Sequence, residues 1–304
     1  MGIGSSVPTF RTRRLAPYND SVRTISVVQL GRVGYGDGLR LQQKLVALRK
    51  GDEIGDVLLL LEHGPVITLG RNAKAANVLM PAEQLAARGV EVFECDRGGD
   101  VTFHGPGQVV GYPIFDLRGF ERNSSQLQAS GSQEEQPFQE SLPSERKTLG
   151  AVDYVRRLEE VLIRTCADFR ISAKRVQKLT GVWTEVEAEA RSEAKIAAIG
   201  VHISRSVTSH GFALNVNTDL SYFNLIVPCG ITSKQVTSMQ KELGREVDSG
   251  QVAESLSRNF GAVFGRQMLW VETVDALLGN SVGVPMKAPT EFRQIHIEEE
   301  THSA

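Results

Sequence analysis

The sequence predicts an α+β fold in one domain, in which helices pack on mixed, largely antiparallel sheets. Several apolar or alternating runs are typical of strands, and turn residues join them to further runs, as in hairpins. The helical patterns are few, and they do not alternate regularly with strands as in a parallel α/β sheet. With 304 residues, of which 41% are hydrophobic and 23% charged, the chain can bury a substantial core.

The first two elements are a strand and a helix. Residues 24–30 (T-I-S-V-V-Q-L) have a strand pattern, and residues 39–48 place apolar side chains at near-helical spacing. The segment between them, 31–38 (G-R-V-G-Y-G-D-G), is rich in glycine but does not match the G-x-G-x-x-G spacing of a dinucleotide-binding turn. We therefore interpret residues 31–38 as a connector.

A hairpin and a short helix follow. The apolar run 56–62 predicts a buried strand, and Gly-Pro turn chemistry followed by residues 66–69 (V-I-T-L) predicts a hairpin. A proline at a first helical position predicts a short helix over residues 81–87. Residues 90–94 alternate as a strand, and residues 109–117 are a further strand candidate.

The second half of the chain contains two longer helices and three strands. Amphipathic helices are predicted over residues 152–169 and 251–264. Residues 195–204 and 209–216 predict paired strands joined by a short polar turn, and residues 268–272 predict a final strand. The stripe of the first helix that we expect to face the core consists of Val152, Val155, Leu158, Leu162 and Phe169, with Cys166 on or beside it.

Composition sets the expected boundaries of the domain. Residues 24–278 should form the folded domain, with a flexible N-terminal extension over 1–23 and a flexible C-terminal tail over 279–304. Residues 121–148 are rich in Ser, Gln and Glu and hold little apolar mass, which predicts a disordered insertion. The arginines of the extension leave open whether it targets an organelle.

Charge and hydropathy exclude several classes of function. A net charge of −2 does not indicate a nucleic-acid partner, since binding a polyanion usually needs a clustered basic surface. The longest purely aliphatic run, residues 57–61, is far shorter than the ~20 residues of a membrane helix, so we expect no membrane association and a cytoplasmic protein. Three widely spaced cysteines suggest reduced thiols rather than disulfides or a zinc site.

One glycine-rich stretch is a candidate for ligand binding. Residues 97–108 (R-G-G-D-V-T-F-H-G-P-G-Q) combine four glycines with an arginine and a histidine. Such a backbone can approach a ligand closely, and its N–H groups can point at developing negative charge. The structural alternative is a tight hairpin whose histidine is satisfied by hydrogen bonds.

A lysine and a cysteine are the other candidates. Lys195 begins a strand that continues with small residues, which leaves room beside it, although a lysine there is usually a solvated edge residue. Cys229 lies between a proline and a glycine at the end of an apolar, strand-like run, 224–231, whereas Cys95 and Cys166 are best interpreted as small buried side chains.

A nucleophilic cysteine generally needs a nearby cation or base, because a thiol of pKa ~8.5 is only slightly ionised at neutral pH. Spacing alone does not choose among the candidates for that role, which are His63, His104, His202, His210 and Lys195.

Three motifs together resemble those of the lipoyl(octanoyl) transferases, also called the lipoate-protein ligase B family. They are R-G-G-D-V-T-F-H-G-P-G-Q-V-V-G-Y-P-I, then K-I-A-A-I-G-V-H-I-S-R, then S-H-G-F-A-L-N-V-N-T-D-L followed by I-V-P-C-G-I. The resemblance covers about residues 24–271, apart from the insertion. It implies a fold similar to the catalytic domain of biotin and lipoate protein ligases.

The resemblance also implies a mechanism without cofactor or metal. Cys229 would accept an octanoyl group from octanoyl-acyl carrier protein as a thioester, and Lys195 would lower the pKa of that cysteine. The acceptor would be a lysine on the lipoyl domain of a 2-oxoacid dehydrogenase E2 subunit or on the glycine-cleavage H protein. The residues implied to bind the acyl group are Arg97, Gly98, Gly99, Asp100, Val101, Thr102, Phe103, His104, Ala198, Ile199, Gly200, Gly211, Phe212 and Ala213.

Three other functions compete with this expectation. An ATP-dependent lipoate or biotin ligase of the same fold would adenylate a carboxylate and would not need Cys229 and Lys195. A non-catalytic acyl-binding protein would tolerate the loss of either residue. A hydrolase of the Cys-His type fits less well, because no protease-like signature surrounds the cysteine.

Overall fold

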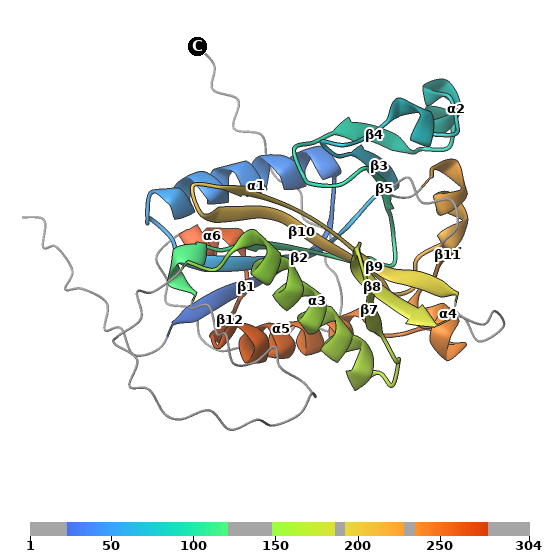
Figure 1. Ribbon diagram of the computed structural model, residues 1–304. Coiled ribbons are helices and arrows are strands. Elements are labelled where there is room, and N and C mark those ends of the chain that lie inside the picture. Colours follow the sequence, from blue (N-terminus) through green and yellow to red (C-terminus); the bar gives the residue numbers. More distant parts are fainter. Residues whose placement is uncertain (1–22, 121–147, 186–191, 228–234, 279–304) are drawn as a thin grey trace, which may run out of the picture.

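The computed structural model describes residues 23–120, 148–185, 192–227 and 235–278. In this part of the chain a large mixed sheet carries helices on both faces, and a small three-stranded sheet lies beside it (Figure 1). The predicted α+β class is confirmed. No helix among these residues combines the length and the apolar character needed to cross a membrane.

The large sheet is mostly antiparallel. Strands β2, β6, β10, β9, β8 and β7 pair antiparallel in that order, whereas β1 pairs in parallel with both β12 and β2, and the short β11 pairs in parallel with β9. The bounds are β12 (Gln267–Val271), β1 (Thr24–Val33), β2 (Asp56–His63), β6 (Gln108–Ile114), β10 (Val207–Asn215), β9 (Glu193–Ser204), β8 (Leu179–Glu185), β7 (Lys174–Val176) and β11 (Gln235–Val236).

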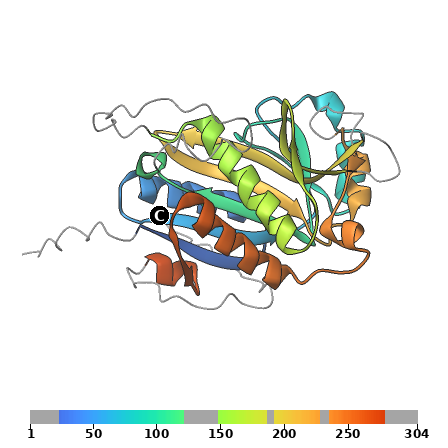
Figure 2. The same ribbon diagram turned by 60° about the horizontal axis from the view of Figure 1, so that its bottom comes forward.

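Three long helices cover the large sheet. Helix α1 (Tyr35–Lys50) lies on one face, and α3 (Ala151–Asp168) and α5 (Ser249–Phe264) lie side by side on the other, as Figure 2 shows. The shorter helices are α2 (Ala82–Ala87), α4 (Met239–Leu243), α6 (Val274–Leu278) and the 3-10 turns η1 (Ala75–Asn77), η2 (Leu117–Gly119) and η3 (Leu220–Leu225).

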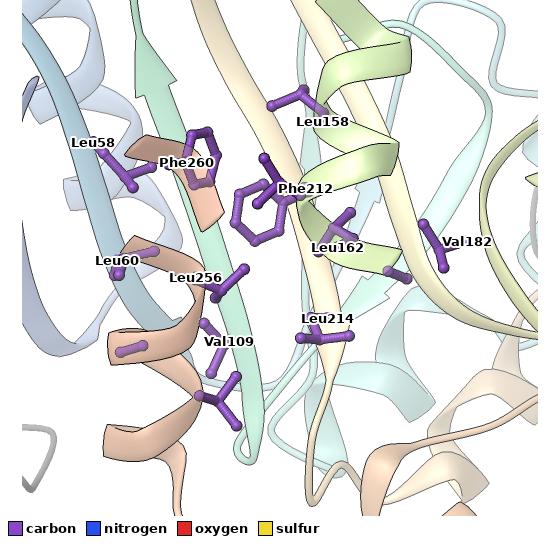
Figure 3. Packing of buried hydrophobic residues seen from close by; sticks show 14 of the residues in the cluster. Leu58, Leu60, Val109, Leu158, Leu162, Val182, Phe212, Leu214, Leu256 and Phe260 are labelled. Atoms are coloured by element: carbon purple, nitrogen blue, oxygen red, sulfur yellow. The ribbon is translucent and has the colours of Figure 1, made fainter. Parts of the chain in front are cut away.

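Strand β2 is buried on both faces, which explains why its sequence is apolar without interruption. Leu58 and Leu60 point into the cluster beneath α3 and α5, and Val57, Leu59 and Leu61 point into the cluster beneath α1. Figure 3 shows the first of these clusters, with side chains of β2, β6, β8 and β10 against those of α3 and α5. A strand that is covered on both faces has a continuous apolar sequence. Each fully buried leucine contributes roughly 2 kcal/mol to the stability of the fold.

The small sheet consists of β4 (Glu91–Glu94), β3 (Val66–Leu69) and β5 (Val101–His104), in that order. The predicted hairpin between residues 56–62 and 66–69 is therefore wrong, because β2 and β3 belong to different sheets. Gly64 and Pro65 end β2 and redirect the chain, and Pro65 then accepts a hydrogen bond from the Glu91 N–H of β4. Periodicity detects a strand but does not tell which neighbour it pairs with.

Most other predicted elements are confirmed, with three corrections. The connector 31–38 shrinks to Gly34, since β1 runs to Val33 and α1 begins at Tyr35. Residues 224 and 225 end η3 rather than a strand, while residues 228–231 lie outside the described part of the chain. Strands β7 and β8 were not predicted.

The third correction concerns the buried face of α3. Leu158 and Leu162 are buried as expected, but Val152 is 72% exposed, because it lies six residues from Leu158 and so about 120° around the helix. The buried face is completed by Tyr154, Val161, Thr165 and Cys166. The expected flexibility of residues 1–22, 121–147 and 279–304 falls outside the described residues.

Candidate active site

A cavity of about 340 Å³ lies where β9 and β10 of the large sheet meet β5 of the small sheet. This volume is within the ~300–1,000 Å³ typical of small-molecule sites. It is lined by Tyr35, Asn72, Arg97–Asp100, Thr102, His104, Val110, Tyr112, Lys178–Thr180, Lys195, Ala198–Gly200 and His210–Ala213. The predicted lysine and twelve of the fourteen predicted binding residues thus come together around one space.

The two exceptions follow from strand geometry. On β5, Thr102 and His104 line the cavity, whereas Val101 and Phe103 belong to the hydrophobic cluster of the small sheet. Successive side chains of a strand point to opposite faces. The glycine-rich stretch predicted as a loop from residue 97 is therefore a loop only as far as Asp100, and a strand from there to His104.

Two paired glycines let three chain segments converge on the cavity. Gly200 of β9 lies opposite Gly211 of β10. A Cβ atom on Gly200 would lie 2.8 Å from the Gly98 carbonyl oxygen, and one on Gly211 would lie 2.2 Å from that of Gly111. Both distances are shorter than real side chains allow, so any larger residue would push the loop at Gly98 or strand β6 away.

Lys195 occupies one wall of the cavity. Its Nζ atom lies 4.7 Å from the centroid of the Trp183 ring, and the two residues pair across β9 and β8. Gly181 of β8 has a φ of +119°, and a Cβ atom there would lie 3.6 Å from Lys195 Cε. An ammonium over an indole face is a favourable contact, so the ring and the bare backbone of Gly181 together fix the lysine.

Cys229 lies outside the described residues, but both flanks of its segment are described. Before it, the Val227 N–H donates to the Asn77 carbonyl at 2.8 Å, and Asn77 Nδ2 donates to Asp100 Oδ2 at 2.5 Å. After it, Val236 of β11 pairs with Lys195. The described flanks of residues 228–234 are therefore linked to two residues of the cavity wall, to Asp100 through Asn77 and to Lys195 through β11.

Arg97 is buried and holds a rigid position in the cavity wall. Its Nε and Nη2 atoms donate to Thr68 Oγ1 at 3.2 and 2.9 Å, Nη2 donates to the Thr68 carbonyl at 2.7 Å, and Nη1 donates to the Gly98 carbonyl at 3.1 Å. All these acceptors are neutral, and no described carboxylate lies within ion-pair distance. Arg97 therefore contributes positive potential to the cavity.

His104 is held neutral by burial. Its Nδ1 donates to Gln108 Oε1 at 2.7 Å, and its Nε2 lies 3.5 Å from Thr68 Oγ1. Burial, with the nearby His63, lowers the pKa of His104 to about 3. Gln108 in turn donates to Asn215 Oδ1 at 2.8 Å, which fixes the imidazole orientation. His104 therefore matches the alternative interpretation of its stretch, in which hydrogen bonds within the protein satisfy the histidine. It nevertheless lines the cavity.

Both ring nitrogens of His63 also make hydrogen bonds within the fold. Its Nδ1 donates to the Val33 carbonyl at 2.8 Å, and its Nε2 accepts from the Tyr112 hydroxyl at 2.6 Å. Burial lowers the pKa of His63 to about 4 and raises that of Tyr112 above its usual range. Within the described ranges, no three side chains of metal-ligating types are placed to hold a metal ion.

Known proteins resemble this chain over most of its length. The family model "Lipoyl protein ligase A/B catalytic domain" matches residues 35–142 and 139–261. An octanoyltransferase of Koribacter versatilis is 53% identical over 278 residues, which are 91% of this chain and 99% of that protein. An octanoyltransferase of Acidobacterium capsulatum is also 53% identical, over 84% of this chain and 96% of its own.

This chain belongs to the lipoyl protein ligase A/B family. Within the family it groups with the octanoyltransferases, so the predictions of the family and of an acyltransferase are confirmed.

Solved structures show that this family member has the ligase fold. A bipartite lipoate protein ligase from Thermoplasma acidophilum superposes with a TM-score of 0.57 at 14% identity, covering 84% of this chain and 91% of that one. A lipoate-protein ligase A bound with ATP gives a TM-score of 0.56 at 14% identity, covering 84% and 92%. The predicted likeness to the catalytic domain of lipoate ligases is thereby confirmed.

Several cavity residues of this family member were not predicted as binding residues. Tyr35, Asn72 and residues 178–180 come from three separate segments outside the three motifs, whereas Val110 and Tyr112 lie near the end of the first motif. His210 is different, because it was a candidate partner for the cysteine and lies within the S-H-G-F-A-L-N motif. The sequence signal that could have assigned His210 to the site is its position next to Gly211, a predicted binding residue.

Proposed function

We propose that the chain transfers an octanoyl group from octanoyl-acyl carrier protein to the lysine of a lipoyl domain, with Cys229 carrying the group as a thioester. The observation that carries the proposal is the position of Lys195. Its ammonium is fixed over Trp183 in a cavity wall to which both described flanks of the segment bearing Cys229 are linked. Val227 is two residues before Cys229, and two extended residues span at most about 7 Å.

The first half-reaction exchanges one thioester for another. The Cys229 thiolate attacks the acyl carbonyl, the carbon–sulfur bond to the carrier breaks, and the carrier thiolate takes a proton and leaves. A cation beside the cysteine favours its thiolate form, which is the role we assign to Lys195. Arg97 adds positive potential where the oxyanion of the tetrahedral intermediate forms.

The second half-reaction forms an amide. The amine of the acceptor lysine attacks the octanoyl carbonyl, and Cys229 leaves as the thiolate, ready for the next cycle. Thioester exchange is nearly isoenergetic and an amide is more stable than a thioester, so the sequence of steps needs no ATP. This absence of ATP distinguishes the proposal from the ligase mechanism.

The shape of the cavity supports an aliphatic acyl group. Ala198 and Ala213 lie opposite each other on β9 and β10, and Val110 and Phe212 add apolar surface. Small side chains at the strand centres leave a slot between the large sheet and β5. We assign the octanoyl chain to this slot.

The relatives support the acceptor class. The Thermoplasma acidophilum ligase is described together with its E2 lipoyl domain. We propose lipoyl domains of 2-oxoacid dehydrogenase E2 subunits and the glycine-cleavage H protein as acceptors here. We further propose that residues 24–278 form the catalytic domain and that it works in the cytoplasm, where thiols stay reduced.

A transfer assay without nucleotide tests this function. The full chain is incubated with octanoyl-acyl carrier protein and an unmodified lipoyl domain, and the mass of the lipoyl domain is followed. The proposal predicts a gain of one octanoyl group at the same rate with and without ATP. Transfer from free octanoate that depends on ATP, with none from the carrier, would contradict it.

A further inference from the structure

His210 has an unusual backbone conformation for a strand residue. Its φ is +55° within β10, where it lies opposite Val201 of β9. Such a conformation costs of order 1–3 kcal/mol in a non-glycine residue and persists where surrounding contacts impose it. One such contact is the hydrogen bond from the His210 N–H to Gln42 Oε1 on α1, at 2.8 Å.

The side chain of His210 lines the cavity and is fixed by an aspartate. Its Nε2–H donates to Asp96 Oδ1 at 2.7 Å, and the second oxygen of Asp96 lies 3.6 Å from His202 Nε2. Asp96 is the only hydrogen-bond partner of the imidazole among the described residues. A neutral His210 with its proton on Nε2 therefore has an unprotonated Nδ1.

This pairing differs from that of the other buried histidines. His63 and His104 each have a protein partner at both ring nitrogens. His210 is 3% exposed, whereas the side chain of its partner Asp96 is 55% exposed to solvent. His210 thus combines a place in the cavity wall, an available nitrogen and a link to water.

The geometry points to His210 as the general base of the second half-reaction, with Asp96 as its positioning residue. This inference rests on the proposed function. An aspartate that holds one nitrogen of an imidazole sets its tautomer and lets the other nitrogen accept a proton.

The acceptor lysine reaches the site as a neutral amine, having released one proton to water. Its nitrogen bonds to the octanoyl carbonyl carbon, and a second proton passes from that nitrogen to His210 Nδ1. The carbon–sulfur bond breaks, Cys229 leaves as the thiolate, and the imidazolium returns its proton to water.

The charges that face His210 act in opposite directions. Burial lowers the pKa of His210, and Arg97 and His202 act in the same direction. Asp96 raises the pKa, while the neutral His104 and the ammonium of Lys195 line the same cavity. The net effect is a lowered pKa for His210, and the Asp96 carboxylate offsets part of that lowering.

The test uses the full chain loaded with octanoyl on Cys229, followed by mixing with an unmodified lipoyl domain. In His210→Asn, asparagine tolerates the positive φ but cannot accept the proton. Transfer to the lysine should slow by roughly 100-fold or more, while loading from octanoyl-acyl carrier protein changes less than roughly threefold. Hydroxylamine, whose nitrogen is unprotonated at neutral pH, should release the acyl group from both proteins at similar rates.

Two further variants separate catalysis from folding. Added imidazole should restore lysine transfer in His210→Gly. In Asp96→Asn, the pH below which the rate of lysine transfer falls should shift to a lower value, because the carboxylate that raises the pKa of His210 is gone. Arg170→Asn, at another positive φ of +64° and outside the cavity, serves as the control and should change neither half-reaction.

Equal slowing of loading, lysine transfer and hydroxylamine release in His210→Asn would overturn the inference and leave a structural role. Normal lysine transfer in that variant would also overturn it, while the proposed function stands. A wild-type chain that never forms the octanoyl-enzyme would instead refute the proposed function, and this inference with it.

Discussion

The Nζ atom of Lys195 lies 4.7 Å from the centroid of the Trp183 ring, and the two residues pair across β9 and β8. Directly paired residues on neighbouring strands share a face, so the lysine rests on the indole. Lys195 is thus fixed by a tertiary contact rather than left as a solvated edge residue.

Replacing Trp183 should therefore change the reactivity of the cysteine. Trp183→Leu removes the ring under the lysine and leaves a void, since Trp183 is 1% exposed. We expect a loss of about 2–3 kcal/mol in the free energy of unfolding and a higher pKa for Cys229. Urea unfolding measures the first, and the pH dependence of Cys229 alkylation by iodoacetamide measures the second.

Trp183→Phe is the matched control. It keeps an aromatic face, and it deletes an indole N–H that has no acceptor among the described residues. The alkylation profile should stay close to that of the wild type. Identical profiles for the Leu and Phe variants would show that the ring does not position Lys195.

Gly200→Ala should disturb the acyl site through the backbone. The new Cβ atom would lie 2.8 Å from the Gly98 carbonyl oxygen, so the loop that carries Arg97 must move. We expect loading of Cys229 to slow at least tenfold and stability to fall by about 1–3 kcal/mol. Gly55→Ala, where a Cβ atom meets nothing within 4 Å, should leave the loading rate unchanged; an equal effect of both substitutions would argue against the steric explanation.

Arg97→Lys should impair the site although the charge is kept. A lysine cannot reproduce the forked bonds to both oxygens of Thr68, and a buried acceptor left unpaired costs about 1–3 kcal/mol. We expect slower loading of Cys229, measured by stopped reaction and mass spectrometry, together with a lower unfolding midpoint. Arg118 is an exposed arginine that forms an ion pair with Asp116, and in Arg118→Lys the loading of Cys229 should proceed at the wild-type rate. Wild-type loading in Arg97→Lys would remove Arg97 from the proposed mechanism.

Stability should fall in mild acid because of two buried histidines. The pKa of His63 is about 4 and that of His104 about 3 in the folded protein, against ~6.5 in the unfolded chain. The unfolded state therefore binds more protons as the pH falls below ~6.5, and each histidine removes up to ~1.4 kcal/mol per pH unit until its folded pKa is reached.

Urea titrations between pH 7 and pH 4 measure this loss. His104→Gln cannot titrate, and its stability should fall less steeply over the same range. An unchanged slope in that variant would contradict the neutral state assigned to His104.

The sequence predicts elements whose signals are local. The β9–β10 hairpin follows from two alternating runs and a short polar turn, and α5 follows from its amphipathic spacing. The elements it misplaces depend on tertiary pairing. Val66–Leu69 was recognised as a strand, but its partners β4 and β5 lie 20 residues or more further along the chain.

The residues of the candidate site that lie in sequence motifs could be named from the sequence. Lys195 and the glycines of β9 and β10 belong to the motifs and line one cavity. The partner of Lys195 could not be predicted, because β8 has no clear strand signal and the contact with Trp183 arises from sheet register. The pairing of His210 with Asp96 joins residues 114 apart, for which no local pattern exists.

Transfer through Cys229 is tested most directly by the intact mass of the chain after incubation with octanoyl-acyl carrier protein. We expect one octanoyl adduct that hydroxylamine removes, that is absent in Cys229→Ser and that forms slowly in Lys195→Ala. An adduct of the same mass that persists in Cys229→Ser would contradict it.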